Sequence, residues 1–489
     1  MTIQILMLYI AIAAAILTAI IGYLKKGHKN WLMTFLQNFT GILFIISGLV
    51  KAIDPMGTAF KMEQYFAEFE YTFKETAFSF IAPLFPFLSN ISLIFSVSMI
   101  VLEIVLGVML LLGHRSKLTS WAFLLLVLFF TVLTGFTFLT GYVPNSVNFF
   151  DFAAWGPYAE TNMRVTDCGC FGDFIKLQPR ISFFKDLVLL VPAFYFVFRH
   201  KDMNQLFTPK ARAITVWGTT ALLLLFCLNN FYWNLPVVDF RPFKVGTDLY
   251  QKKMAEEEAA AAVKIISMKL KNKKTGEIAD LAYEVYMKEW AKYPKDEWET
   301  IEQIKSKITI EPTKVSEFSV MSPDGFDVAE DILTDSGNVF LVVAYKLKGT
   351  SSTQDLMVPD TTWNMDTVTV GKDSTIIVKN IGQIGTRKET KEVFAWDEAY
   401  VEDYKTRVNV LMEDAMKQGA KVYAMAGGAG EAKLASFKAA IGSTYDWYEA
   451  DDILLKTIIR SNPGVVHIKG GKVINMWHIR HLPESVPLN

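Results

Sequence analysis

The chain has 489 residues, of which 51% are hydrophobic, and its formal net charge at pH 7 is −1. A near-neutral charge without a basic stripe gives no reason to expect nucleic acid as a partner, and three cysteines are too few for a small secreted domain held together by disulfides. The long apolar runs lie in residues 1–235, whereas residues 236–489 have the composition of a soluble domain.

The first half contains six apolar runs that we expect to span a membrane, since about 20 apolar residues cross a bilayer. The first run lacks the basic start of a cleaved signal peptide, so we expect it to remain as a helix. The fifth is short and contains Pro192. The six expected spans are residues 2–24, 36–53, 91–112, 119–140, 182–199 and 213–233.

The charges of the connecting loops predict an orientation. Lys and Arg are concentrated after the first, third and fifth spans, whereas Asp and Glu dominate the other two loops. Basic loops stay in the cytoplasm. The N-terminus, the loop before the fifth span and the C-terminal half are therefore expected outside. In a bacterium this is the periplasm, where disulfides form and persist.

The loop at residues 54–90 is long enough to have structure. Aromatic and charged residues alternate with a helical rhythm over 59–80, which predicts an amphipathic helix at the membrane surface or a plain helical connector. Small residues also indicate that the second and third spans pack closely. These residues are Gly41, Ser47, Gly48, Ser92, Ser96 and Gly107.

Two charged residues in the membrane half are candidates for binding a cofactor. Glu103 lies deep in the third span, where an ionised group is expensive. Its depth is roughly 18 Å at the α-helical rise, whereas Lys51 lies at the outer end of the second span, so we expect the two not to pair. Glu103 can relay protons, contact a quinone headgroup, or be a protonated side chain bonded to a neighbouring helix. Lys51 is expected to extend towards the interface.

Cys168 and Cys170 are separated only by Gly169. A disulfide across so small a ring is strained and exchanges readily, and Gly169 eases the bend that it needs. Asp167 and Asp173 favour the protonated thiols. An exchange-active pair and a structural disulfide both remain open.

Other roles for the thiols depend on residues elsewhere. A zinc site would need further ligands, which only His467, His478 or His481 of the C-terminal half can supply, so we expect no metal. Cys227 in the sixth span is either a resolving thiol for the pair or a buried apolar residue.

Two stretches resemble a known family. Residues 167–172, DCGCFG, resemble the CGCFG signature of the MauE branch of the DoxX-like membrane proteins. Residues 47–55, SGLVKAIDP, with Gly57 and Tyr65-Phe66, resemble the DoxX pattern, as does Glu103 with Gly107 and Gly113. The resemblance covers roughly residues 30–200 and implies a bundle of four membrane helices.

The resemblance also implies a direction for the function. MauE-type proteins are linked to cofactor and disulfide maturation of a periplasmic dehydrogenase, and DoxX-type proteins to thiol and sulfur redox chemistry at the membrane. The bundle is similar in outline to vitamin K epoxide reductase, which couples thiols to a quinone, but this chain has no Cys-x-x-Cys in its membrane spans. A quinone is therefore the cofactor that the resemblance suggests.

The second half predicts an α/β domain. Residues 248–264 indicate an exposed helix or linker, and residues 265–320 a small region of strands and helices. Strands and helices then alternate, which favours a parallel sheet, and Gly470-Gly471 predicts a final hairpin. The expected strands are 339–345, 422–425, 446–448, 465–468 and 473–477, and the expected helices are 397–418, 431–441 and 451–459.

This order resembles the thioredoxin-like fold over roughly residues 315–485, with Pro463 where that fold places a cis-proline. Residues 346–352 stand in place of its Cys-x-x-Cys. The domain has no cysteine, which leaves docking of a client or partner, or shielding of the thiol loop, as its role. An insertion at roughly 350–395 is expected to be a surface hairpin or a disordered loop, and His478 and His481 are expected at the surface.

The sequence therefore predicts an α-helical membrane bundle at 1–235, a linker region at 236–314 and a periplasmic thioredoxin-like domain at 315–489. The predicted function is periplasmic thiol–disulfide exchange or maturation at the bacterial inner membrane through Cys168 and Cys170, with a periplasmic client or redox partner. The alternative is a non-catalytic scaffold or assembly subunit of an envelope complex, with the two cysteines as a structural disulfide.

Overall fold

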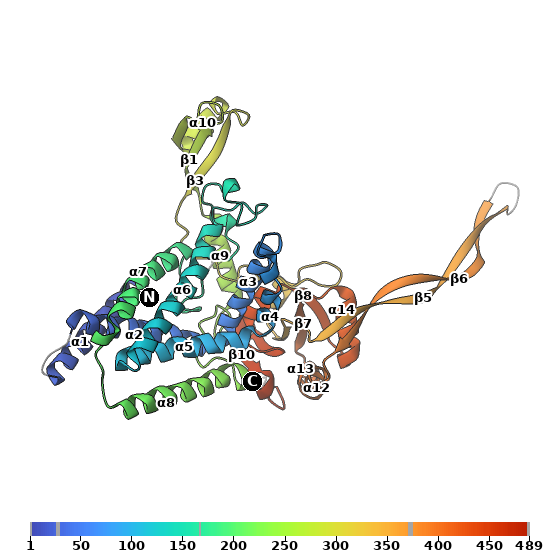
Figure 1. Cartoon of the computed structure of the whole chain (residues 1–489). Helices are drawn as coiled ribbons and strands as arrows, with labels where there is room; N and C mark the ends of the chain where they lie inside the picture. Colours follow the sequence, from blue (N-terminus) through green and yellow to red (C-terminus); the bar gives the residue numbers. More distant parts are fainter. Residues whose placement is uncertain (1, 26–29, 166–167, 370–374, 487–489) are drawn as a thin grey trace. The chain divides into compact units, whose positions relative to one another are not determined.

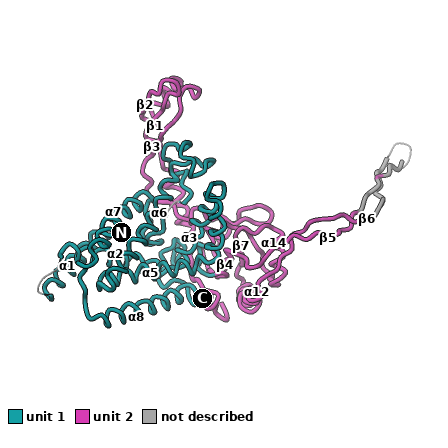
Figure 2. Tube along the Cα trace, in the orientation of Figure 1, with its two compact units in different colours: residues 1–247, 456–461 teal, residues 248–455, 462–489 magenta. Residues whose placement is uncertain are grey.

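A computed structural model describes residues 2–25, 30–165, 168–369 and 375–486. The chain divides into two compact units (Figure 2). The first unit comprises residues 1–247 and 456–461, and the second comprises residues 248–455 and 462–489.

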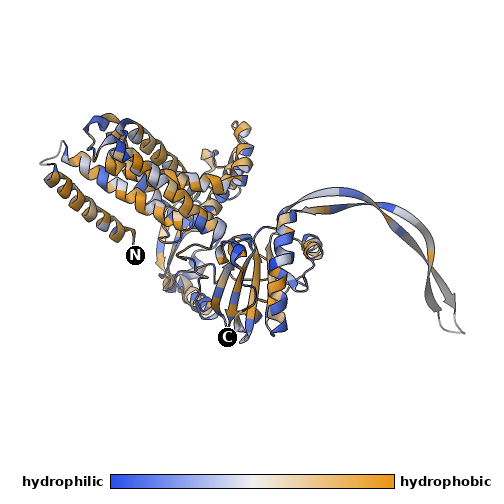
Figure 3. Ribbon diagram, turned by 90° about the horizontal axis from the view of Figure 1, so that it is seen from below, coloured by the Kyte–Doolittle hydropathy of each residue, from blue (hydrophilic) through white to orange (hydrophobic). Residues whose placement is uncertain are grey.

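Among its described residues the first unit has six helices long and apolar enough to cross a membrane, which confirms the six predicted spans. Their ribbons are largely coloured as hydrophobic in Figure 3. Polar side chains cap the start of three of them: Thr2 accepts from the Ile5 amide, Asn30 from the Met33 amide and Thr208 from the Ala211 amide. The helices are α1 (Ile3–Leu24), α2 (Trp31–Ile53), α5 (Ser92–Leu112), α6 (Ser116–Thr140), α7 (Pro179–Arg199) and α8 (Pro209–Leu228), labelled in Figure 1.

Helices α2 and α5 are in backbone contact, as the small residues predict. A Cβ atom built on Gly107 lies 2.8 Å from the carbonyl oxygen of Gly41. One built on Gly48 lies 2.4 Å from Ile104 Cγ1. Glycine at these positions therefore lets the two helix axes approach closely.

Asp54 ends α2 and begins α3 (Pro55–Lys74), because its carboxylate accepts from the Gly57 amide at 2.9 Å and Pro55 suits the first helical position. The predicted amphipathic helix is present, and its apolar side packs within the bundle. The Tyr65 hydroxyl bonds Thr137 Oγ1 at 2.9 Å, and Phe66 meets Phe95 edge to face. Helix α4 (Leu84–Asn90) follows.

The second unit begins with α9 (Leu249–Ala261), which was expected to be exposed. That expectation is wrong for one face. Glu256 is buried and accepts from the amide and hydroxyl of Thr313 and from the Ser316 amide. The next strands form a separate antiparallel sheet in the order β2-β1-β3. Its elements are β1 (Ile265–Asn272), β2 (Ile278–Ala282), α10 (Tyr283–Glu289) and β3 (Trp298–Lys305).

A five-stranded sheet in the order β10-β9-β4-β7-β8 follows. Strands β4, β7 and β8 are parallel, and β9 and β10 are antiparallel to their neighbours, so the predicted parallel core with a final hairpin is confirmed. The apolar run of β4 is buried because the strand lies in the middle of the sheet. The strands are β4 (Asn338–Ala344), β7 (Lys421–Gly427), β8 (Asp446–Ala450), β9 (Gly464–Lys469) and β10 (Lys472–His478), and the helices are α11 (Ala329–Thr334), α12 (Glu398–Asp403), α13 (Asn409–Lys417), α14 (Glu431–Ile441) and α15 (Asp452–Ile458).

Details of the C-terminal hairpin agree only partly with expectation. The Asn462–Pro463 peptide is cis, and Gly470 and Gly471 have φ angles of 56° and 75°. His478 is buried, so its expected surface position is wrong, whereas His481 is exposed. The reason is the alternation of β10, which turns His478 to the same face as the buried Met476.

The insertion after β4 forms a hairpin and not a disordered loop in its described part. Strands β5 (Gly349–Thr369) and β6 (Thr375–Trp396) pair in an antiparallel ribbon. Within the described ranges, neither strand joins another sheet. At its base, the Trp396 ring lies 4.9 Å from that of Phe437 in α14.

The α2–α5 contact can be tested by Gly107→Ala, with Gly218→Ala as the matched control. Overpacking of this kind costs about 1–3 kcal/mol, so we expect Gly107→Ala to lower the thermal midpoint of the detergent-solubilised protein, followed by circular dichroism. A Cβ on Gly218 of α8 meets no described atom within 4 Å, so its variant should be unchanged or more stable. Equal midpoints for the two variants would contradict the contact.

Candidate functional site

Several residues of the 47–55 motif make specific contacts within the first unit. The Ser47 hydroxyl donates to the backbone oxygen of Cys170 at 2.9 Å. Gly48 faces Ile104 of α5, and Asp54 caps α3. Helix α2 therefore ties the cysteine loop to the interior of the bundle.

Lys51 and Glu103 form a buried ion pair, with 2.5 Å between Lys51 Nζ and Glu103 Oε2. Only 6% of Lys51 and 3% of Glu103 is exposed. The prediction that they lie apart is therefore wrong, as is the interfacial position of Lys51. The Lys51 ammonium also lies 5.0 Å from the centroid of the Phe130 ring.

The error has a geometric cause. The prediction assumed that the second and third spans end at the same level. In the structure Gly48, near the end of α2, lies beside Ile104, in the middle of α5. The first turns of α5 extend past α2 and pack on α3, where the Ser96 hydroxyl donates to the Pro55 oxygen.

A second charged pair lies on α7, where Lys185 donates to Asp186 Oδ1. Thr134 of α6 donates to the other oxygen, Asp186 Oδ2, at 2.9 Å. Asp186 is 2% exposed. The sequence analysis did not select this pair, although two adjacent charges inside the fifth apolar run are a signal of a functional position.

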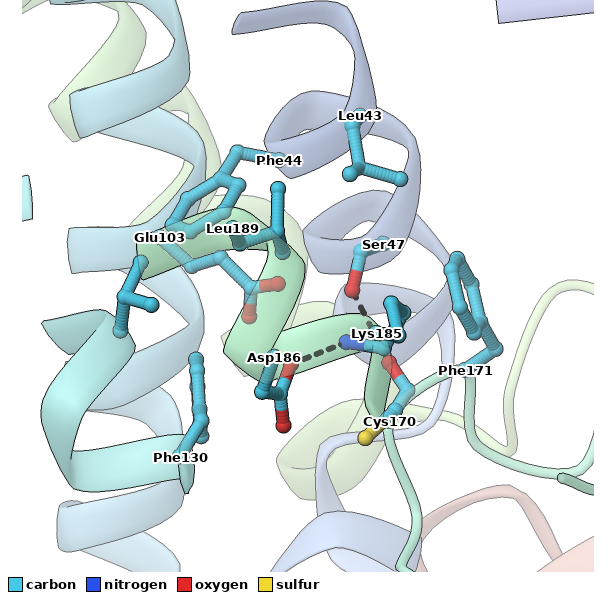
Figure 4. A pocket seen from close by; sticks show the side chains of 11 residues that line it. Leu43, Phe44, Ser47, Glu103, Phe130, Cys170, Phe171, Lys185, Asp186 and Leu189 are labelled. Atoms are coloured by element: carbon cyan, nitrogen blue, oxygen red, sulfur yellow. Dashed lines mark hydrogen bonds and ion pairs between the residues drawn. The ribbon is translucent and has the colours of Figure 1, made fainter. Parts of the chain in front are cut away.

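A small cavity of about 20 Å³ lies between the charged side chains of Glu103, Lys185 and Asp186 and the cysteine loop. Figure 4 shows the side chains that line it. A cavity of this size holds about one water molecule. Four helices and the loop contribute to its wall. The lining residues are Leu43, Phe44, Ser47, Glu103, Val127, Phe130, Cys170, Phe171, Lys185, Asp186 and Leu189.

The cysteine loop turns tightly against the bundle. Gly169 and Gly172 have φ angles of 61° and 51°, which other residues rarely adopt, and the Gly172 amide bonds the Gly169 oxygen. The sulfurs of Cys168 and Cys170 are present as thiols; Cys168 is buried and Cys170 half-buried. Asp167 lies outside the described residues.

Charges around the cavity act on the Cys170 thiol in opposite directions. Burial raises the pKa of Cys170, and it is the largest effect. The Lys185 ammonium lowers that pKa, the Asp186 carboxylate raises it, and Lys51 lowers it further. Cys170 is therefore a desolvated thiol whose ionisation depends on the lysines next to it.

The structure brings Lys51, Glu103 and Cys170 together but places Cys227 elsewhere. Cys227 is fully buried in α8, where it packs with apolar residues that include Ala52 and Ile100. In the part of the chain that is described, no group of three or more His, Cys, Asp or Glu side chains is placed to hold a metal ion.

The cavity also bears on the suggested quinone. Glu103 and Lys51 bind each other, and the space beside Glu103 takes about one water molecule. A quinone ring does not fit this cavity. No step of the chemistry is therefore assigned to a quinone.

Comparison with known protein families gives a match over the first part of the chain. The family model described as methylamine utilisation protein MauE matches residues 29–145. The chain is similar to this family over that stretch, which contains the 47–55 motif and Glu103 but ends before Cys168. No curated protein and no solved structure matches the chain.

The Lys51–Glu103 pair can be tested by comparing Glu103→Gln with the double variant Glu103→Gln/Lys51→Met. Removing one partner of a buried ion pair costs about 3–5 kcal/mol because the other charge is left uncompensated, whereas replacing both by apolar or neutral groups costs much less. We expect the double variant to be the more stable of the two in unfolding of the detergent-solubilised protein. Additive losses would contradict the ion pair.

Proposed function

We propose that this membrane protein handles thiol–disulfide exchange, or disulfide maturation, of periplasmic clients through Cys168 and Cys170. The observation that carries the proposal is the position of the Cys170 thiol, which shares a water-sized cavity with Lys185 and Asp186. A disulfide that only fastens a loop does not need buried charges beside it. A thiol that must ionise during exchange does, because the thiolate is the reactive form.

The spacing of Cys168 and Cys170 favours a disulfide that exchanges over one that only fastens the loop. A disulfide between Cys168 and Cys170 would close a ring around a single glycine. Strained disulfides have more oxidising reduction potentials, so such a disulfide would readily oxidise a client dithiol. The positive φ of Gly169 supports the bend that the ring requires.

The proposed location is the bacterial cytoplasmic membrane, with the cysteine loop in the periplasm. Described basic residues after α1, α5 and α7 support this orientation: Lys25, Arg115, Lys117, Lys210 and Arg212. The orientation puts Cys168 and Cys170 in an oxidising compartment. The resemblance to MauE-type proteins makes a periplasmic dehydrogenase the class of client to test first.

We further propose that the C-terminal unit is thioredoxin-like and binds the client or a redox partner. The sheet order β10-β9-β4-β7-β8 supports this assignment. The unit contains no cysteine, so it takes no part in the exchange itself.

A second candidate is a scaffold without catalysis, in which the cysteines only fasten the loop. The ribbon formed by β5 and β6 favours this candidate, because a long two-stranded projection has many backbone groups and side chains available to a partner. Its expected partner would be stoichiometric and independent of the cysteines.

Trapping distinguishes the two candidates. Cys168→Ser and Cys170→Ser, each in a Cys227→Ser background, leave one thiol of the pair. We expect at least one variant to accumulate a mixed disulfide with a periplasmic protein and both to lose the maturation activity, as seen by non-reducing electrophoresis and mass spectrometry of trapped species. The Cys227→Ser parent is the control.

The redox state of the pair in cells gives an independent reading. Alkylation of rapidly quenched cells should find Cys168 and Cys170 partly reduced if the pair turns over. A fully oxidised pair, together with full function of both serine variants, would establish the scaffold and exclude exchange.

A further inference from the structure

The two buried lysines differ in what surrounds them. Lys51 faces the carboxylate of Glu103 in a closed ion pair. Lys185 lines the cavity together with Cys170. Among the charged groups that act on this thiol, Lys185 has the largest effect on its pKa. In Figure 4 the Lys185 amine lies between the Asp186 carboxylate and the cysteine loop.

The partner of Lys185 does not depend on Lys185 alone. Thr134 holds Asp186 Oδ2 from α6, while Lys185 donates to Oδ1. Asp186 therefore stays oriented and bonded if the ammonium turns towards the sulfur. The Lys51–Glu103 pair is the opposite case, because a turn of Lys51 would break the buried ion pair with Glu103.

We propose that Lys185 is the positioning residue that stabilises the Cys170 thiolate and so makes Cys170 the sulfur that leaves when the Cys168–Cys170 disulfide opens. This inference rests on the proposed exchange function. The inference specifies that Cys170 is the sulfur that leaves, that Cys168 is the sulfur that binds the client, and that the Lys185 charge determines this order.

The step starts from the oxidised pair, which the oxidising redox partner proposed above must regenerate after each turn by accepting two electrons, and from there it balances. A client thiolate attacks Cys168 Sγ, forming the bond between client sulfur and Cys168 while the Cys168–Cys170 bond breaks. The electron pair of the broken bond goes to Cys170 Sγ, which becomes a thiolate beside the Lys185 ammonium. The client's second thiolate then attacks its own sulfur in the mixed disulfide, the client is oxidised, and Cys168 leaves as the second thiolate.

The choice of Cys170 rests on position, because of the two cysteines Cys170 is the one that lines the cavity beside Lys185. Exchange is faster when the departing thiol is the more stable anion. Burial raises the pKa of Cys170 and opposes its departure, and the Lys185 ammonium offsets part of that cost. Burial remains the larger effect and the pKa of Cys170 stays raised on balance, so without this ammonium Cys170 would be a still poorer leaving group.

Several other charged groups near the loop have partners of their own among the described residues. On α3, the stem of Lys61 packs over Gly169 and its amine donates to Gln64. On α2 and α5, Lys51 and Glu103 bind each other. Helix α6 contributes only uncharged residues, Val127 and Phe130, to the described lining. Asp173 follows the loop and accepts from Arg460 at 3.3 Å within the first unit.

The sign of the expected effect follows from the two charges on α7. Loss of the Lys185 charge raises the pKa of Cys170, so less thiolate is present at a given pH. Loss of the Asp186 charge lowers it, so more thiolate is present. A general loosening of the bundle would not move the two variants in opposite directions.

The test measures alkylation of Cys170 against pH in the reduced full-length chain in lipid nanodiscs, in a Cys168→Ser/Cys227→Ser background. We expect Lys185→Met to move the midpoint of the rate upwards by about one pH unit, which slows alkylation about tenfold below the midpoint. Asp186→Asn should move it downwards, and Lys185→Arg should keep it near the parent value. An unchanged midpoint in Lys185→Met, or shifts of the same sign in both charge-removing variants, would overturn the role of Lys185.

A second measurement separates this inference from the proposed function. Cys170→Ser should trap the client on Cys168, whereas Cys168→Ser should trap little, because Cys170 is the sulfur that leaves. Trapping mainly on Cys170 overturns the inference but leaves exchange intact. Trapping on neither sulfur, with the midpoint shifts still present, rejects the exchange function and not the electrostatic coupling of Lys185 to Cys170.

Discussion

The close approach of α2 and α5 fixes the geometry on which the site depends. Glycines at the contact allow the backbones to touch, and a touching pair of helices has little freedom to slide. That register places Lys51 level with Glu103, and it places Ser47 where its hydroxyl holds the Cys170 backbone. The cysteine loop is thus positioned by contacts made inside the bundle and not by the loop alone.

Buried charge is the second constraint. Lys51 with Glu103 and Lys185 with Asp186 carry equal and opposite charges, so the bundle can hold them in apolar surroundings only as pairs. Such pairs are weak evidence for stability, since well-packed apolar residues serve that purpose at least as well. Their position beside a thiol is instead a reason to connect them with chemistry.

Local sequence patterns predicted the helices and strands well, but they predicted the contacts between helices poorly. The six spans and the strand–helix order of the second unit follow from apolar runs and turn residues, which are properties of neighbouring positions. The pairing of Lys51 with Glu103 depends on where α2 ends relative to α5, and no local pattern records this offset. The 350–395 insertion was compatible with a hairpin or a loop, because its composition does not state whether its two arms pair. The Lys185–Asp186 pair was visible in the fifth apolar run, but its value appears only when the cysteine loop is seen against it.

The separation of Lys51 and Glu103 along the chain has a consequence for biogenesis. They are 52 residues apart, so α2 leaves the ribosome with an unpaired lysine well before α5 exists. Until then the lysine must stay near water or be held by the insertion machinery, because a lone charge at depth is costly. The final position of α2 in the membrane is therefore reached only after α5 has inserted. A chain truncated between α2 and α5 would contain a span that is hydrophobic enough to enter the membrane. Its Lys51 would have no counter-ion, so α2 could not adopt its final position.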